Sequence, residues 1–128
     1  MSAQKSLDDL IVDEEQLNES LLTEILAPHA GIASESGDFV PTDEFRDLKS
    51  DAQTAVVLLH RKAAFELGLA DEEGATPSQI SQASGINHNT VKTAVRELDE
   101  EGIVSNDGGS YTIPTYNYER AAEIIQGS

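Results

Sequence analysis

The sequence contains no cysteine and no tryptophan, and it has only three phenylalanines and three tyrosines among its 128 residues. The absence of cysteine excludes disulfide bonds, thiolate metal sites and cysteine nucleophiles. Apolar residues make up 38% of the chain, which suffices for a small, mainly aliphatic core. A chain of this length forms one domain with some additional segments, because it has no room for two large domains.

Long apolar runs are missing as well. No stretch approaches the roughly 20 apolar residues that a membrane-spanning helix needs. The first ten residues, MSAQKSLDDL, lack the basic and apolar regions of a signal sequence. We therefore expect a soluble, cytoplasmic protein that has no membrane partner.

Patterns of catalytic or metal-binding residues are also lacking. The three histidines, His29, His60 and His88, lie about 30 residues apart, without the paired spacing of metal ligands. Carboxylates are plentiful, but none stands beside a histidine, a serine or a glycine-rich phosphate loop in a recognisable arrangement. The sequence therefore predicts a protein that is not an enzyme and that needs no metal and no cofactor.

Basic residues are scarce: eight Lys and Arg stand against 24 Asp and Glu, which gives a formal net charge of −16. An acidic interaction protein, a disordered chain or a folded protein built for high salt would each explain this charge. Clear helical periodicity argues against disorder. The scattered acids resemble the surfaces of proteins from halophilic archaea, where a Debye length of about 3 Å at about 1 M salt screens repulsion. We favour this last explanation.

The chain divides into four parts on sequence grounds. We expect a flexible acidic tail over 1–15, an N-terminal helix with an irregular extension over 16–50, a central domain over 51–114 and a C-terminal helix over 115–128. Within the extension, GDFVP is either a short edge strand or a turn. Ser50 and Gln53 predict a capping box at the start of a helix that ends near Gly68.

The most regular pattern begins at Thr76, which forms a second expected capping box with Gln79, and Pro77 follows at the first helical position. Gly85 suits a tight turn, and Asn87 suits the cap of the next helix. That helix has an apolar stripe at Val91, Ala94, Val95 and Leu98. SNDGGS then supplies the turn of a hairpin, and YTIP supplies its second strand.

Taken together, TPSQISQASGINHNTVKTAVRELDEEGIVSNDGGSYTI resembles the winged helix-turn-helix domain of bacterial and archaeal transcription regulators. The resemblance covers residues 76–113, or about 51–113 if the preceding helix is included. It implies a mainly α fold with a small β-hairpin wing (α+β), to which this chain adds N- and C-terminal helices. It also implies that the second helix of the motif lies in the major groove of DNA.

The residues expected to contact DNA lie on and beside this second helix. They are Ser78, Asn87, His88, Asn89, Thr90, Lys92, Thr93 and Arg96, with Asn106, Ser110 and Tyr111 on the wing. Asn can read adenine, Arg can grip guanine and Thr can contact a thymine methyl group. No acid occurs from Gly74 to Arg96, whereas acids return at Glu97. Arg61 and Lys62 are further candidates for phosphate contact, although an exposed helix face explains them equally well.

The wing departs from the family pattern, because its tip carries Asp107 and no Arg or Lys. With few cations per subunit, we expect a homodimer that sets two recognition helices side by side. The candidate dimer interface consists of Leu17, Leu21, Ile25, Tyr118, Ala122 and Ile125. The alternative is that these residues only extend the core of one chain.

Two functions follow from these observations. The first is a sequence-specific, double-stranded-DNA-binding transcription regulator that is adapted to high salt. The alternative is an acidic winged-helix adaptor that binds a protein partner, such as a component of the transcription machinery, without contacting DNA.

Overall fold

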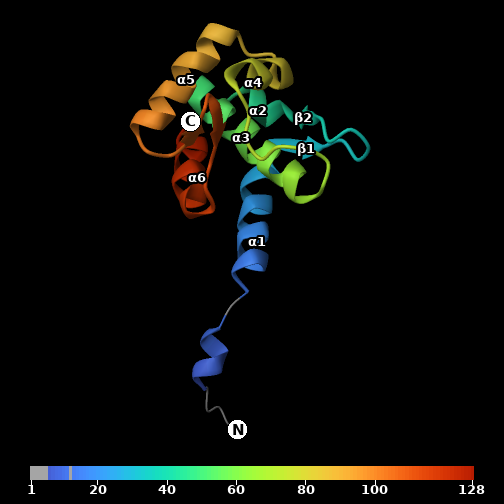
Figure 1. Cartoon of the computed structure of the whole chain (residues 1–128), viewed down its shortest axis with the longest axis vertical. Coiled ribbons are helices and arrows are strands. Elements are labelled where there is room, and N and C mark those ends of the chain that lie inside the picture. The colour runs from blue at the N-terminus through green and yellow to red at the C-terminus, as the bar shows by residue number, and fades with distance from the viewer. Residues whose placement is uncertain (1–5, 12) are drawn as a thin grey trace.

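The computed structural model describes residues 6–11 and 13–128, and it is mainly helical, with short antiparallel hairpins (Figure 1). The elements in chain order are η1 (Leu7–Leu10), α1 (Glu14–Leu26), β1 (Ala30–Ile32), β2 (Phe39–Pro41), α2 (Asp43–Arg46), α3 (Ser50–Glu66), α4 (Pro77–Ser84), α5 (His88–Glu100), β3 (Ser105–Asp107), β4 (Ser110–Thr112), η2 (Thr115–Asn117) and α6 (Tyr118–Gln126). This confirms the predicted fold class, a mainly α winged-helix domain with additional helices at both ends.

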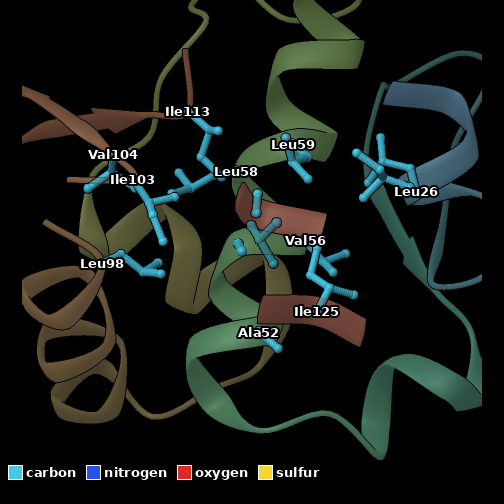
Figure 2. Packing of buried hydrophobic residues seen from close by; sticks show 14 of the residues in the cluster. Leu26, Ala52, Val56, Leu58, Leu59, Leu98, Ile103, Val104, Ile113 and Ile125 are labelled. Carbon is cyan, nitrogen blue, oxygen red and sulfur yellow. The ribbon is translucent and has the colours of Figure 1, made fainter. Parts of the chain in front are cut away.

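Helix α3 forms the centre of the molecule. Its neighbours are α1, α4, α5, α6 and strands β1 and β4, so it is buried on almost every side. Figure 2 shows Val56, Leu58 and Leu59 of this helix among apolar side chains from α1, α5, α6 and the segments that flank β3 and β4. The sequence predicts one apolar stripe along this helix, formed by Ala52, Ala55, Val56, Leu59, Ala63 and Leu67. Leu67 is instead 65% exposed, whereas α3 is buried on other faces too, because several elements pack against it.

The predicted capping box at the start of α3 is wrong. Ser50 is the first helical residue, Lys49 occupies the cap position, and no side chain caps the helix. The amide of Gln53 instead donates a hydrogen bond of 3.0 Å to the carbonyl of Phe45 in α2. The Gln53 side chain is therefore engaged in a tertiary contact with α2 and not in the helix cap that the local pattern predicted.

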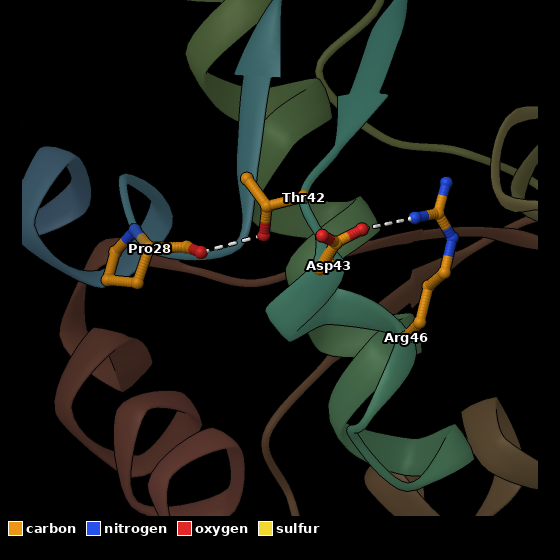
Figure 3. A network of polar contacts seen from close by, with 4 residues as sticks. All are labelled: Pro28, Thr42, Asp43 and Arg46. Carbon is orange, nitrogen blue, oxygen red and sulfur yellow. Dashed lines mark hydrogen bonds and ion pairs between the residues drawn. The ribbon is translucent and has the colours of Figure 1, made fainter.

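The extension before α3 contains a β-hairpin. Strands β1 and β2 pair antiparallel, with Gly31 opposite Val40, so GDFVP contributes an edge strand whose partner the sequence did not reveal. The hairpin is closed at its base, where the hydroxyl of Thr42 donates to the carbonyl of Pro28 at 2.7 Å. Figure 3 shows this bond beside the exposed ion pair of Asp43 and Arg46.

The wing consists of β3 and β4, which pair with Asn106 opposite Tyr111. A third short segment joins them, because Ala75 and Tyr111 exchange backbone hydrogen bonds of 2.9 and 2.8 Å. The stretch DEEGA (71–75) predicts a solvated loop, but its last residue, Ala75, is buried. The sequence also predicts an extended run that begins at Ile103 and Val104, but these two residues are buried in the core and β3 begins at Ser105.

The terminal helices share the core of the central domain. Leu22 and Leu26 of α1 and Ala121 and Ile125 of α6 belong to the same buried cluster as α3 and α5. The division into four parts remains a prediction, and residues 1–5 and 12 of the expected tail lie outside the described residues. Within the described part of the chain, no helix is long and apolar enough to cross a membrane.

Candidate nucleic-acid interface

Helix α4 begins as the sequence predicts. The Thr76 hydroxyl accepts a hydrogen bond of 3.3 Å from the Gln79 backbone, and the Gln79 side chain accepts one of 2.9 Å from the Thr76 backbone. Pro77 stands at the first helical position. The capping box is therefore confirmed, and it satisfies two backbone donors that the helix itself leaves free.

Two serines stabilise the turn between α4 and α5, and neither was predicted from the sequence. The hydroxyl of Ser81 donates to the carbonyl of Ile86. The hydroxyl of Ser84 donates to the carbonyl of Ile80 at 2.7 Å and accepts from the backbone of Ile86 at 3.1 Å. The sequence signal for this role was the position of Ser81 and Ser84 near the end of a short helix that is followed by Gly85, since serine side chains often bond to nearby backbone groups there. These bonds fix the direction in which the chain enters α5.

Helix α5 is amphipathic. Its apolar stripe, Val91, Ala94, Val95 and Leu98, is buried, as predicted, and the helix packs against α3. Asn87 caps the helix through its side-chain oxygen, which accepts a hydrogen bond of 2.9 Å from the backbone of Asn89. The oxygen of Asn87 is thus engaged in positioning the helix, while the opposite face of α5 points away from the core.

All eight residues predicted to contact DNA on α4, on α5 and at the α5 cap are exposed. They are Ser78, Asn87, His88, Asn89, Thr90, Lys92, Thr93 and Arg96. Asn89, Lys92, Thr93 and Arg96 recur at spacings of three and four, so they share one face of the helix. The hydroxyl of Thr93 donates to the carbonyl of Asn89 at 3.2 Å. This bond directs the polar end of Thr93 to the helix backbone.

The cations of α5 have no carboxylate partner. Among residues 6–11 and 13–128, the two ion pairs are Asp43–Arg46 at 2.7 Å and Lys62–Glu73 at 2.8 Å. Lys92 and Arg96 take part in neither. The acids of the α5 C-terminal end, Glu97, Asp99, Glu100 and Glu101, are exposed, so charge changes sign along the helix. The acid-free stretch covers all of α4 and the first part of α5.

Lys62 is buried and already paired, so it is not available for the phosphate contact that the sequence left open. It is 5% exposed, donates to the carbonyl of Ile113 at 2.9 Å and pairs with Glu73. Arg61 is half-buried, and its guanidinium donates to the carbonyl of Gly74 at 3.4 Å. These two residues therefore connect α3 to the wing and to the loop before α4.

The wing candidates mainly shape the hairpin. The side-chain oxygen of Asn106 accepts a hydrogen bond of 2.9 Å from the backbone of Gly109 across the turn. Ser110 and Tyr111 are half-buried. The Ser110 hydroxyl packs closely against Gly74, because a Cβ atom added to Gly74 would lie only 2.7 Å from the Ser110 Oγ atom. Asp107 is exposed at the tip.

The dimer candidates fall into two groups. Ile25, Tyr118 and Ile125 are buried in the core of the single chain, so they are not available to a partner surface. Leu21 and Ala122 are half-buried, whereas Leu17 is 56% exposed. Leu17 and Leu21 line a surface cavity of about 460 Å³ together with Tyr116.

Comparison with known proteins agrees with this geometry. Residues 69–105 match the family model described as winged helix-turn-helix DNA-binding. No curated protein and no solved structure matches the chain. The matched segment contains α4, the turn and α5 up to the first residue of β3, and it indicates a DNA-binding winged-helix domain. In the described ranges, no group of three or more histidines and carboxylates is arranged to hold a metal ion.

Proposed function

We propose that this protein is a sequence-specific transcription regulator that inserts α5 into the major groove of DNA. The observation that supports the proposal is the exposed face of α5, on which Lys92 and Arg96 stand free of ion pairs in an acid-free stretch of a strongly acidic chain. The family match over residues 69–105 gives independent support for DNA binding.

The side chains on this face suit base recognition. Asn89 offers an amide that pairs with adenine, and Arg96 offers a guanidinium that pairs with guanine. Thr93 presents its methyl group to a thymine, since its hydroxyl is bonded to the Asn89 carbonyl. Ser78, His88 and Thr90 lie at the starts of α4 and α5, where phosphate contacts fix the register of a recognition helix.

The charge of −16 fits a protein that works in concentrated salt. At about 0.1 M salt the Debye length is about 10 Å, so the exposed acids of the chain would repel phosphate over that distance. At about 1 M salt the Debye length of about 3 Å confines electrostatic effects to direct contacts. Binding then depends on the local face of α5 and not on the total charge.

We further propose that the regulator acts as a homodimer. Two cations on α5 give each subunit few phosphate contacts, and pairing two subunits doubles them. Leu17, Leu21 and Ala122 are the members of the predicted interface that remain at least partly exposed. A two-fold dimer would place two copies of α5 about 34 Å apart, on successive turns of a palindromic site.

The first test replaces the two cations of α5. We expect Lys92→Ala/Arg96→Ala to weaken DNA binding at least about tenfold, because each direct contact contributes roughly 1–3 kcal/mol. DNA fragments selected from a genomic pool at high potassium serve as the probe, and mobility shift gives the affinity. The control Arg46→Ala/Lys49→Ala removes the same charge from exposed positions outside α4 and α5. Equal binding by the α5 variant and the unmodified protein would refute the assignment of the recognition helix.

The wing supports a second candidate function, an adaptor that binds a protein partner. Residues 105–112 include no cation, and Asp107 at the exposed tip would repel phosphate. An adaptor would retain no DNA fragment at any salt concentration. Recovery of bound fragments in the selection therefore decides between the two functions.

A further inference from the structure

The C-terminal end of α5 leaves three backbone carbonyls for partners outside the helix. Its last turn is closed by backbone bonds, since the amide of Gly102 donates to the carbonyl of Asp99 at 3.0 Å. The amide of Ile103 donates to the carbonyl of Leu98, also at 3.0 Å. Gly102 has φ of +74°, the left-handed conformation that ends such a turn. The carbonyls of Glu101, Gly102 and Ile103 follow this turn and accept bonds from another element.

Two side chains from the segment η2–α6 bind these carbonyls. The Asn117 amide donates to Gly102 at 3.0 Å and to Ile103 at 2.9 Å. The Arg120 guanidinium donates to Glu101 at 2.5 Å and to Gly102 at 3.4 Å. Figure 1 shows α6 beside this end of α5. Because the donors lie 14 to 19 residues beyond the carbonyls, these bonds join two elements and do more than end one helix.

The two donors stand on a fixed base. Tyr118, Ala121 and Ile125 of α6 are buried, and the helix packs against α3. Asn117 is buried as well, and its amide group uses both of its N–H donors on the two carbonyls. A buried amide requires such partners. The position of α6 in the core therefore determines the position of the end of α5.

The charge at this end of α5 makes the guanidinium of Arg120 important. Four exposed acids stand there: Glu97, Asp99, Glu100 and Glu101. Negative charges at a helix C-terminus oppose the helix dipole, and a cation at the last carbonyls offsets them. Arg120 belongs to neither of the ion pairs found among residues 6–11 and 13–128, and its guanidinium is bonded to carbonyls instead.

Fixing this end matters for the exposed face of α5. The Asn87 cap fixes the start of the helix, and the apolar stripe packs along its middle. Apolar packing is non-directional and permits small tilts, whereas hydrogen bonds are directional. Nine residues span about 13.5 Å of helix, so a tilt of about 5° about Asn87 would move the backbone of Arg96 by about 1 Å. Such a shift is large for a hydrogen bond to a base edge.

We propose that Arg120 and Asn117 are positioning residues that set the angle of α5 in the major groove, so that selectivity among DNA sequences depends on them. This inference rests on the proposed function. Attraction to phosphate tolerates a small tilt, but the base contacts of Asn89 and Arg96 require donor–acceptor distances near 3 Å. Loss of the bonds to α6 therefore lowers affinity for the selected DNA site more than affinity for unrelated DNA.

The test compares two duplexes of equal length, the selected site and a scrambled sequence, by fluorescence anisotropy at high KCl. We expect Arg120→Ala to lower the ratio of the two affinities about three- to tenfold, the effect of one or two lost hydrogen bonds. Arg120→Lys keeps the charge and one point of contact, so it should recover part of the ratio. The matched control Arg46→Ala removes the same charge from an exposed position on α2 and should leave the ratio unchanged.

The ratio separates positioning from stability, because partial unfolding or a change of net charge alters both affinities alike. Equal losses for the two duplexes in Arg120→Ala would overturn the proposal. Asn117→Ala removes the other two bonds and should lower the ratio in the same way. If this buried variant does not fold, the Arg120 variants decide. Equal binding of both duplexes by the unmodified protein would instead refute the proposed function.

A measurement without DNA examines the contact itself. Hydrogen exchange reports the opening of the amides of Glu101, Gly102 and Ile103, which donate within the last turn of α5. We expect exchange of these amides to be about fivefold faster in Arg120→Ala than in Arg46→Ala. The Val91 amide, bonded at the start of α5, should exchange equally in both variants. Unchanged exchange at the last turn would refute the role of Arg120 whether or not the protein binds DNA.

Discussion

Two buried polar residues of α3, His60 and Lys62, differ in how their polar atoms are satisfied. The Lys62 ammonium donates to the Ile113 carbonyl, pairs with Glu73 and lies 5.6 Å from the centroid of the Tyr118 ring. The Nε2 atom of His60 has no partner. A buried ammonium is tolerated only with such partners, whereas a buried histidine can remain neutral.

The state of His60 predicts how stability depends on pH. Burial lowers the pKa of His60 below its usual 6.5, with a smaller lowering from Arg61 and partial compensation by the backbone and charge of Asp38. The unfolded chain takes up a proton near the usual pKa, while the folded chain takes it up only at lower pH. Between these values the unfolded state binds more protons, so the free energy of unfolding falls as pH decreases.

We expect denaturant unfolding to show a larger loss of stability between about pH 7.5 and about pH 5 in the unmodified protein than in His60→Gln. His88→Gln serves as the control, since His88 is exposed at the start of α5. It should lose stability to the same extent as the unmodified protein. Identical pH profiles for His60→Gln and the unmodified protein would contradict a buried, neutral imidazole.

Sequence patterns placed the exposed residues of α5 well, because a regular helix repeats its faces every three to four residues. They did not place Lys62, whose hydrogen-bond partner Ile113 is 51 residues away. They also did not find Ser81 and Ser84, because their role depends on the path of the turn. Residue roles set by local geometry were thus predictable, and roles set by distant partners were not.

The helix-turn-helix element depends on a backbone conformation that only glycine adopts easily. Gly85 ends α4 with φ of +77°, in the left-handed region that the sequence predicted for the turn. An added Cβ at this position would meet no atom within 4 Å, so any cost of a substitution comes from the backbone alone.

We therefore expect Gly85→Ala to lower the free energy of unfolding by about 1–2 kcal/mol, the cost of a left-handed residue with a side chain. Gly31→Ala is the matched control, since an added Cβ at Gly31 also meets nothing within 4 Å and its φ is not positive. That variant should change stability little. Urea unfolding measures both, and equal effects would show that the turn tolerates other backbone conformations.

At the level of elements, capping residues located the starts of α4 and α5. The α4 cap and the Asn87 cap agree with the structure. The errors occur at Ser50 and at Ala75, where contacts with α2 and with the wing override the local pattern. Such contacts join segments that lie apart in the sequence, and periodicity carries no information about them.

The charge of the whole molecule bears on its interaction with DNA. Most proteins lose affinity for DNA as salt rises, because phosphate contacts release bound counterions. With a charge of −16 and two unpaired cations on α5, repulsion from the rest of the molecule opposes that trend. Screening relieves the repulsion more than it weakens the few direct contacts.

We predict that affinity for a selected DNA site stays constant or rises between about 0.5 M and about 3 M KCl. Fluorescence anisotropy with a labelled site provides the measurement. The Lys92→Ala/Arg96→Ala variant serves as the control and should bind at least about tenfold more weakly across the series. A steep decrease of affinity with rising salt would contradict the proposed adaptation.

The sequence by itself determined the turn, the capped start of α4 and the two faces of α5, because these follow from interactions between residues a few positions apart. Only the tertiary structure decided which apolar residues outside α5 form the core. It buried Ile25, Tyr118 and Ile125 within one chain, joined Ala75 to the wing and placed Arg120 against the carbonyls at the end of α5. These outcomes depend on which faces of the helices and strands pack against each other, and such contacts join residues that lie far apart in the sequence.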